Sequence, residues 1–187
     1  MKKIFMQVVS MLMIVSCHAQ SNPPSHKDSL AYINATKEFY RQYILQKKSI
    51  STKQVIKLSV EDEPVMVNKE DVSGKTKTKI DSILKLPHLS LITKWTKTLL
   101  PDVSTIISRG SISNIFQDNT KGWNYFYKQY GYGYYSFSAP VFFNNYSSCL
   151  VYITHHCGWL CGDGGLYLYG KKKDKWQLVT TYYHWIS

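Results

Sequence analysis

The sequence predicts an α+β fold in which N-terminal helices pack on a C-terminal four-stranded antiparallel meander sheet. Three observations support this fold class. Segments with helical spacing of apolar residues come first, and runs rich in β-branched and aromatic residues follow from position 134. In addition, 20 of the 27 aromatic residues lie in positions 123–187, so the C-terminal third builds the core or presents a binding face. Helices followed by strands are typical of α+β domains.

The first residues, MKKIFMQVVSMLMIVSCHAQ, have the pattern of an export signal. A basic start at Lys2 and Lys3 precedes an apolar run, Ile4–Val15, that is too short to span a membrane. The sequence IVSC resembles a lipobox, which predicts that Cys17 receives a lipid and becomes the new N-terminus. Cleavage before Gln20 by an ordinary signal peptidase is the alternative, and it would give a soluble periplasmic or secreted protein.

One domain is expected after the export signal. We assign residues 1–17 to a lipoprotein-type signal peptide, residues 18–28 to a tether and residues 29–187 to a single α+β domain. The tether contains the polar stretch SNPPSHKD, whose two prolines disfavour helix. The predicted location is the periplasm-facing surface of a membrane, with the lipid as anchor.

The mature chain is basic. Without Lys2 and Lys3 it holds 21 lysine and arginine residues against 12 acidic ones, a net charge of +9. An exported protein meets little nucleic acid, so we expect no nucleic-acid partner; anionic lipid, lipopolysaccharide or acidic glycans fit the charge better. The charge is spread along the chain, which is typical of a solvated basic surface.

Two segments have clear helical spacing. The first covers residues 28–48, with Asp28 or Ser29 as its cap, and the second follows Thr120 as its cap and ends at Gly131. Their apolar faces are formed by Tyr32, Ala35, Phe39 and Tyr43 in the first helix, and by Trp123, Phe126, Tyr127 and Tyr130 in the second. We expect the second helix to lie on the sheet that follows it.

The segments between these helices have weaker patterns. Residues 54–60 alternate as an extended segment, and Glu61 to Glu63 would form an acidic turn. Ile80, Ile83 and Leu84 share a stripe that predicts a short helix ending at Pro87. Residues 88–116 have the least regular pattern, and within them LSLITKWTKTLLP is assigned to helix.

Four strand-like runs complete the chain. They are separated by NNY, by the cysteine segment and by KKKD, all of which are typical of turns. Short connections between consecutive strands favour antiparallel pairing. The runs are Tyr134–Phe143, Ser148–His156, Leu166–Gly170 and Lys175–Trp185.

The C-terminal motifs resemble a family of bacterial exported proteins with no established activity. The matching runs are GWNYFYKQYG, YSFSAPVFFNN, CLVYITHHCGWLCGDGGLYLYGKKKDKWQLV and the terminal WIS, so the resemblance covers residues 106–187. The paired CG dipeptides and the following Lys–Trp strand make it specific. The resemblance implies an architecture rather than an activity. The chain departs from the family pattern at His155 and His156, where a small polar residue is expected, so a shared catalytic role for them is disfavoured.

The stretch ITHHCGWLCGDGG contains the candidate site. On an extended strand, His155 and His156 point to opposite faces and do not readily bind one ion together. Cys149 lies roughly 26 Å along the strand from Cys157, too far for a disulfide, so we expect it to be buried and unpaired. Cys157 and Cys161 flank a tight loop and should form a disulfide in an oxidising compartment. We expect Gly158, Gly162, Gly164 and Gly165 to supply the positive φ values of a wide turn.

Three chemical alternatives stay open for this stretch. A zinc site would use Cys157, Cys161 and His155, with Asp163 as a further ligand, although the spacing fits a zinc knuckle only loosely. A thiol enzyme would use Cys157 or Cys161 with His155, His156 or His184. A redox-active cysteine pair is related to it, but the usual spacing has two intervening residues. Asp163 lacks the partner carboxylate that a glycoside hydrolase needs.

The predicted function is therefore a non-enzymatic binding or interaction module of the cell envelope. Trp159, at the tip of the disulfide-closed loop, is the predicted contact residue, with Asp163 beside it. The predicted partners are the membrane, through the lipid anchor, and an envelope protein, peptide or glycan. No cofactor and no metal are expected. The alternative is a Cys/His-dependent envelope hydrolase or thiol redox enzyme centred on Cys157 and Cys161.

Overall fold

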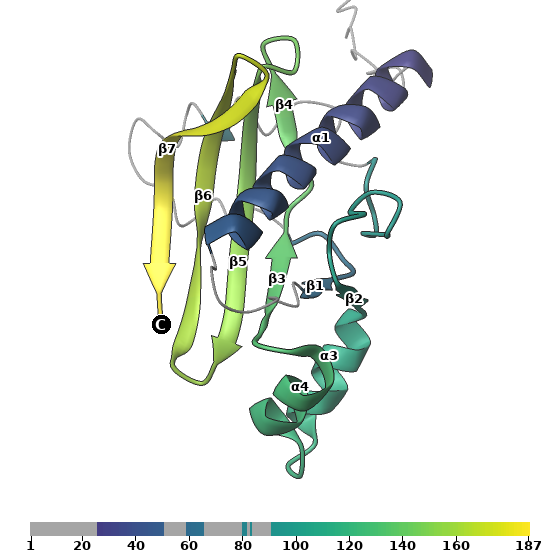
Figure 1. Ribbon diagram of the computed structural model, residues 1–187, viewed down its shortest axis with the longest axis vertical. Coiled ribbons are helices and arrows are strands. Elements are labelled where there is room, and N and C mark those ends of the chain that lie inside the picture. The colour runs from purple at the N-terminus through teal and green to yellow at the C-terminus, as the bar shows by residue number, and fades with distance from the viewer. Residues whose placement is uncertain (1–25, 51–58, 66–79, 82, 84–90) are drawn as a thin grey trace, which may run out of the picture.

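The computed structural model describes residues 26–50, 59–65, 80, 81, 83 and 91–187 and has an α+β fold, as the sequence predicts. The predicted export signal and Cys17 lie outside these residues. In the described part, helices α1, α3 and α4 accompany one mostly antiparallel sheet (Figure 1). The elements are α1 His26–Ile50, β1 Ser59–Glu61, β2 Thr105–Ile107, α3 Arg109–Gln117, α4 Gly122–Tyr130, β3 Tyr134–Phe137, β4 Val141–Phe143, β5 Ser148–Gly158, β6 Cys161–Lys172 and β7 Lys175–Ile186. Helix α1 begins within the stretch assigned to the tether, so residues 26–28 are helical.

The sheet is larger than the predicted four-stranded meander. Within the described residues it has seven strands in the order β2-β1-β3-β5-β6-β7, with β4 also paired to β5. The first predicted run is divided into β3 and β4, and β3, β5, β6 and β7 pair antiparallel in turn. The short strand β1 adds parallel pairs to β2 and β3. Local periodicity does not reveal these pairs, because each strand is three or four residues long and its partner is distant in sequence.

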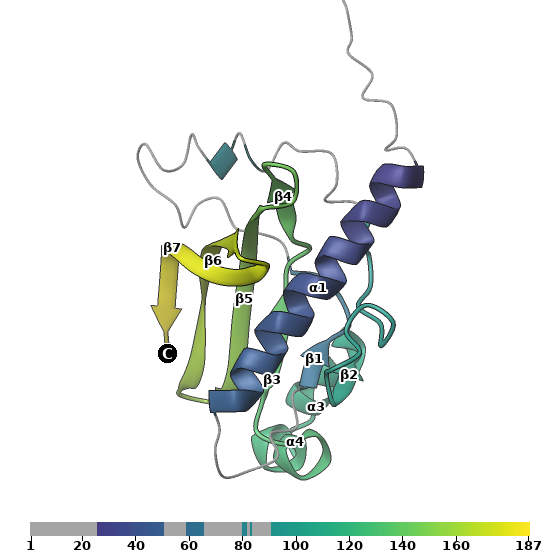
Figure 2. The ribbon, with the colours of Figure 1, turned by 45° about the horizontal axis from the view of Figure 1, so that its top comes forward.

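Helix α1 crosses one face of the sheet, as both views show (Figures 1 and 2). Its predicted apolar stripe is buried: Tyr32 and Phe39 are fully buried, and Tyr43 is 8 % exposed. Phe39 meets the rings of Tyr169 and Trp176 edge-on, at centroid distances of 5.1 and 5.4 Å. Burial of one such ring stabilises the fold by ~1.5–3 kcal/mol.

The hydroxyl groups of two α1 tyrosines form hydrogen bonds with the residues that separate β3 from β4. Tyr32 donates to the carbonyl of Pro140, and Tyr40 donates to that of Ser138. Both tyrosines are fully buried, so these bonds satisfy polar groups that would otherwise be costly inside the core. The break in the strand is therefore held against α1.

The opposite face of the sheet has a smaller apolar cluster. Ile80, which lies in the predicted short helix, is 1 % exposed and packs with Val141, Leu150 and Leu166. Leu150 neighbours Cys149 and Val151, which belong to the α1-facing core. Cys149 and Val151 thus face one side of β5 and Leu150 the other, as expected of an extended strand.

Helices α3 and α4 lie together at one end of the sheet (Figure 1). Ile112 and Ile115 of α3 pack against Phe126 of α4, and Tyr134 at the start of β3 joins this cluster. The prediction that α4 lies on the sheet is therefore wrong. The apolar side chains of α4 pack chiefly against α3. The sequence pattern does not predict α3, because only Ile112, Ile115 and Phe116 are apolar within RGSISNIFQ.

The ends of α4 match the prediction in part. Gly131 follows the helix with φ 93°, and its amide donates to the carbonyl of Tyr127, as expected for a terminating glycine. Thr120 is not the cap: the helix follows Lys121, and Thr120 instead donates its hydroxyl to Asp118 at 2.6 Å. Gly122 starts the helix with φ 65°, a conformation that glycine adopts readily.

Residues 91–104 form turns and bends, so the predicted helix in LSLITKWTKTLLP is wrong. Trp95 is 2 % exposed and donates its indole N–H to the carbonyl of Phe137 at 3.2 Å. Its ring contacts Tyr40 of α1 edge-on. Burial of this one indole, rather than a helical apolar stripe, fixes the path of the segment.

No helix in the described part of the chain is both long and apolar enough to cross a membrane.

Candidate functional site

Strands β5 and β6 form a hairpin that ends in a two-residue turn, Trp159 and Leu160. The sulfur atoms of Cys157 and Cys161 lie at bonding distance across this turn, with their Cα atoms 5.0 Å apart, as predicted. A β-bulge lies between His156 and Gly158. Trp159 and Leu160 are 80 % and 89 % exposed, so the cross-link presents two large apolar side chains to solvent.

The glycines of the hairpin have a different role from the one predicted. Among the described glycines, the positive φ values belong to Gly122, Gly131 and Gly133, and not to those of the hairpin. The Trp185 ring of β7 instead lies against Gly164, where a Cβ atom would stand 2.7 Å from the indole nitrogen. A Cβ at Gly165 would meet the carbonyl of Tyr183 and the Tyr167 ring. The absence of side chains at Gly164 and Gly165 of β6 therefore leaves room for strand β7 and for the rings of Tyr167 and Trp185.

The two adjacent histidines point to opposite faces of β5, as predicted. His155 stacks on Tyr135 at 4.4 Å, and its Nδ1 lies 3.5 Å from a carboxylate oxygen of Asp163. His156 stacks on Tyr134 at 4.9 Å, and its Nε2 lies 3.1 Å from the Thr154 hydroxyl.

Burial lowers the pKa of His156 below its ordinary value, and the nearby Glu61 opposes this shift only in part. The neutral imidazole is thus favoured. His184 is exposed on the edge strand β7, and its ring centroid lies 6.5 Å from that of Tyr167. The three histidines therefore do not converge on the Cys157–Cys161 pair.

The cysteines offer no reactive thiol in this arrangement. Cys157 and Cys161 are bonded to each other. Cys149 is free and fully buried, as predicted, and desolvation raises the pKa of its thiol well above the ordinary value. Thiol chemistry needs an accessible thiolate, which none of these three residues provides.

Asp163 lies within β6, directly opposite His155, rather than in a turn. It does not share a groove with Trp159. Among the described residues, no group of three or more histidine, cysteine, aspartate or glutamate side chains is placed to hold a metal ion.

Trp159 instead faces the start of α4 across a groove of about 590 Å³. This volume lies within the range of small-molecule sites, ~300–1,000 Å³. The aromatic wall is formed by Phe116, Trp123, Tyr127 and Trp159. The polar wall is formed by Asp118, Asn119, Lys121 and Asn124.

A hydrogen bond links the two sides of this groove. The Tyr127 hydroxyl on α4 donates to the carbonyl of Cys157 on β5 at 2.6 Å. Tyr127 also lies beside Gly158, where a Cβ atom would come within 3.1 Å of its hydroxyl oxygen. The disulfide-closed hairpin is thus joined to α4 at the residue beside the turn, which fixes Trp159 relative to the helix.

The charged side chains of the groove neutralise each other. Lys121 lies 2.9 Å from one carboxylate oxygen of Asp118, and Thr120 donates to the other through both its hydroxyl and its amide. These hydrogen bonds, with that from Thr120 the strongest, hold the pKa of Asp118 well below its usual range. The groove wall therefore carries no net charge from this pair.

The polar residues of the groove were missed in the sequence analysis. They lie in the segment DNTKGWN, which was treated only as the start of a helix. Its density of aspartate, asparagine and threonine next to a tryptophan was the available signal. Its distance in sequence from Trp159 hid the connection, because only the docking of α4 onto the hairpin brings the two together.

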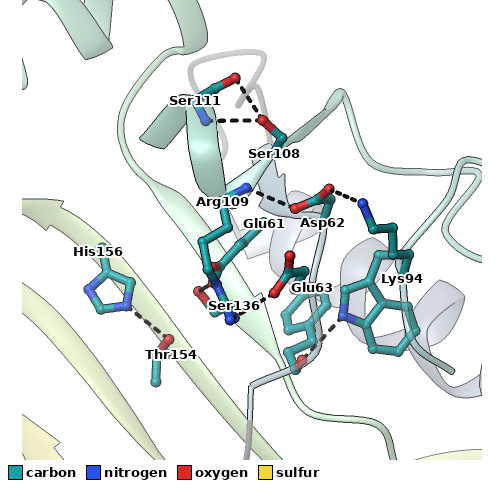
Figure 3. A network of polar contacts seen from close by, with 12 residues as sticks. Glu61, Asp62, Glu63, Lys94, Ser108, Arg109, Ser111, Ser136, Thr154 and His156 are labelled. Carbon is teal, nitrogen blue, oxygen red and sulfur yellow. Dashed lines mark hydrogen bonds and ion pairs between the residues drawn. The ribbon is translucent and has the colours of Figure 1, made fainter. Parts of the chain in front are cut away.

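A second polar cluster lies where β1 and β3 meet the start of α3 (Figure 3). Glu61, 7 % exposed, accepts hydrogen bonds from Arg109 and from the hydroxyl of Ser136. Arg109 also pairs with Glu63 at 2.8 Å, and its amide donates to Asp62. The hydrogen bond that Arg109 donates to Glu61 raises the pKa of Arg109.

This cluster ties β1 and β3 to the first turn of α3, which is a structural role. Its carboxylates are directed at protein partners rather than into a cavity (Figure 3). His156 and Thr154 lie apart from it and toward each other in the same view. The predicted acidic turn over Glu61 to Glu63 is correct only in part, because Glu61 is a buried residue of β1 whereas Asp62 and Glu63 lie in the bend that follows it.

Comparisons with protein-family models, curated proteins and solved structures give no match to this chain. The resemblance of residues 106–187 to a family of exported proteins thus stays a prediction.

Proposed function

We propose that this protein is a lipid-anchored binding module of the cell envelope that takes up its ligand in the groove between Trp159 and α4. The observation that supports the proposal best is the position of Trp159. Its side chain is 80 % exposed, belongs to a disulfide-closed turn and forms one wall of the groove. A residue on a cross-linked turn loses little backbone freedom when it contacts a ligand.

The envelope location rests on the sequence. The export signal and the lipobox at Cys17 support a membrane-attached, periplasm-facing protein, as does the resemblance to exported proteins. A disulfide between Cys157 and Cys161 fits an oxidising compartment. The partners are then the membrane, through the lipid, and an envelope glycan, peptide or protein at the groove.

A binding function is favoured over a Cys/His enzyme. Cys157 and Cys161 are consumed by their mutual bond, and the free Cys149 is buried with a raised pKa. His155 and His156 point away from each other across the sheet. These positions supply no base beside a thiolate, which a thiol enzyme needs.

A thermal-shift screen tests this function. The mature chain is screened against short peptides and oligosaccharides, together with Trp159→Ala and Leu160→Ala. Leu160 is the matched control, because it is the other residue of the turn and does not line the groove. We expect ligands to raise the Tm of the wild type and of Leu160→Ala, but not that of Trp159→Ala. Equal rises in all three proteins, or turnover of a ligand, would contradict the proposal.

A further inference from the structure

We propose that the groove between Trp159 and α4 binds an uncharged saccharide chain, an inference that rests on the proposed binding function. Three features of the groove point to this chemical class: a continuous row of aromatic rings, unpaired amide groups, and the absence of net charge on its wall.

The rings form a row that is longer than the groove itself. Phe116 contacts Trp123 at 4.7 Å, Trp123 contacts Tyr127 at 5.7 Å, and Tyr127 stacks on Tyr132 at 5.3 Å. Tyr132 is 78 % exposed, so the row runs from the groove out to solvent, and Trp159 lines the same groove. Aromatic faces offer flat apolar area to the C–H faces of pyranose rings. The rings of the row tilt or stack against one another, so the faces open to a sugar unit are chiefly those of the exposed Tyr132 and Trp159 rings. Two such rings suit more than one sugar unit.

The amide groups suit hydroxyl-rich ligands. Asn119 and Asn124 line the groove with exposed side chains, and neither amide has a hydrogen-bond partner among the described residues. Each amide offers two donors and a carbonyl acceptor. A sugar hydroxyl is also both donor and acceptor, so these side chains can bind it in either sense.

The charge of the groove disfavours a polyanion. Lys121 is paired with Asp118 at 2.9 Å, and it also lies over the Tyr125 ring at 5.6 Å. The lysine is therefore already balanced, although the mature chain as a whole is strongly basic. Nucleic acids, acidic glycans and phosphate-bearing ligands need cationic groups that are not already neutralised.

Calorimetric titration of the mature chain tests this inference. The probes are tetra-N-acetylchitotetraose and cellotetraose as uncharged chains, tetragalacturonate as an acidic chain, a Trp-containing tripeptide, and vesicles of phosphatidylethanolamine and phosphatidylglycerol. We expect an uncharged tetrasaccharide to bind with the same affinity at low and high salt, because no charged contact is involved. Trp159→Ala should weaken this binding about tenfold or more. Asn124→Ala should weaken it about threefold, and Leu160→Ala should leave it unchanged.

The outcomes separate this inference from the broader function. If the tripeptide binds through Trp159 and neither uncharged tetrasaccharide binds, the saccharide is wrong and the binding groove stands. Tighter, salt-sensitive binding of tetragalacturonate would overturn the uncharged class. Vesicle binding that depends on both Trp159 and Leu160 would assign the turn to a lipid surface instead. If no probe binds in a Trp159-dependent way, both the inference and the proposed function fail.

Discussion

At Gly164 a hydrogen atom occupies the place where any other residue would put a carbon 2.7 Å from the Trp185 indole nitrogen. The same carbon would stand 2.8 Å from the Thr154 methyl group. The indole itself is fixed, because its N–H donates to the Tyr152 hydroxyl at 3.0 Å. Close packing against Trp185, and not turn geometry, thus accounts for the glycine at position 164.

Gly164→Ala should therefore lower the free energy of unfolding by ~1–3 kcal/mol, the usual effect of overpacking. Chemical denaturation measures the change. Gly110→Ala in α3 is the control, since a Cβ there meets nothing within 4 Å and alanine favours helix. A Gly164→Ala protein as stable as the wild type would mean that Trp185 does not lie on β6 as described.

At the same scale, the burial of His156 predicts that the stability of the fold depends on pH. Because burial lowers its pKa in the folded state, the unfolded chain binds the proton more readily. Stability is then full above the unfolded pKa of about 6.5 and falls as the pH drops from there through the folded pKa. Urea unfolding between neutral and mildly acidic pH should show this loss, and His156→Gln should reduce it.

The exposed residue His184 provides the control for this pH effect. His184→Gln should keep the wild-type dependence. An unchanged dependence in His156→Gln would remove His156 as its cause.

At the scale of elements, the disulfide is the main constraint on the β5–β6 hairpin. Closing a loop of this length stabilises the fold by ~2 kcal/mol on the chain-entropy model. Replacing Cys157 and Cys161 by serine should lower stability by about this amount or less, as measured by denaturation. The bond between Tyr127 and the Cys157 carbonyl should persist, since it uses the backbone.

The same double variant separates stability from binding. If the cross-link holds Trp159 ready for a ligand, the variant should bind more weakly than the wild type at temperatures where both are folded. Undiminished affinity would show that the turn is ordered without the cross-link.

The elements also show what the sequence can predict. The sequence predicts helix α1 and strands β5 and β7 because their patterns are long and local. It also predicts that Cys149 is a buried free thiol. Strands β1 and β2 were not assigned as a parallel pair, because three residues carry little periodicity. The disulfide followed from spacing and compartment, whereas the partner of Trp159 depended on where α4 docks.

Across the whole molecule, aromatic rings serve two purposes. The largest group fills the core between α1 and the sheet, where burial raises the pKa of Tyr40 and Tyr43 well above the ordinary value. Tyr135 and Tyr169 have pKa values raised to about 12, chiefly by desolvation. A separate group at the α3–α4 end remains partly exposed around the groove.

The buried tyrosines predict alkaline unfolding. A phenol whose pKa is raised by folding ionises more easily in the unfolded chain, so stability should fall as the pH rises above about 10. Tyrosinate absorbance and circular dichroism should then change together for the buried rings. Ionisation of these rings while the fold persists would contradict their burial beneath α1.

The most direct test of the account follows the five indole N–H signals in an NMR titration of the mature chain with tetra-N-acetylchitotetraose. The groove contains Trp123 and Trp159, whereas Trp95 and Trp176 are each 2 % exposed. Trp185, bonded to Tyr152, completes the set of internal controls. The account predicts that the signals of Trp123 and Trp159 shift and saturate together while the other three stay in place. Shifts confined to Trp185, or no shift at Trp159 at any concentration, would contradict it.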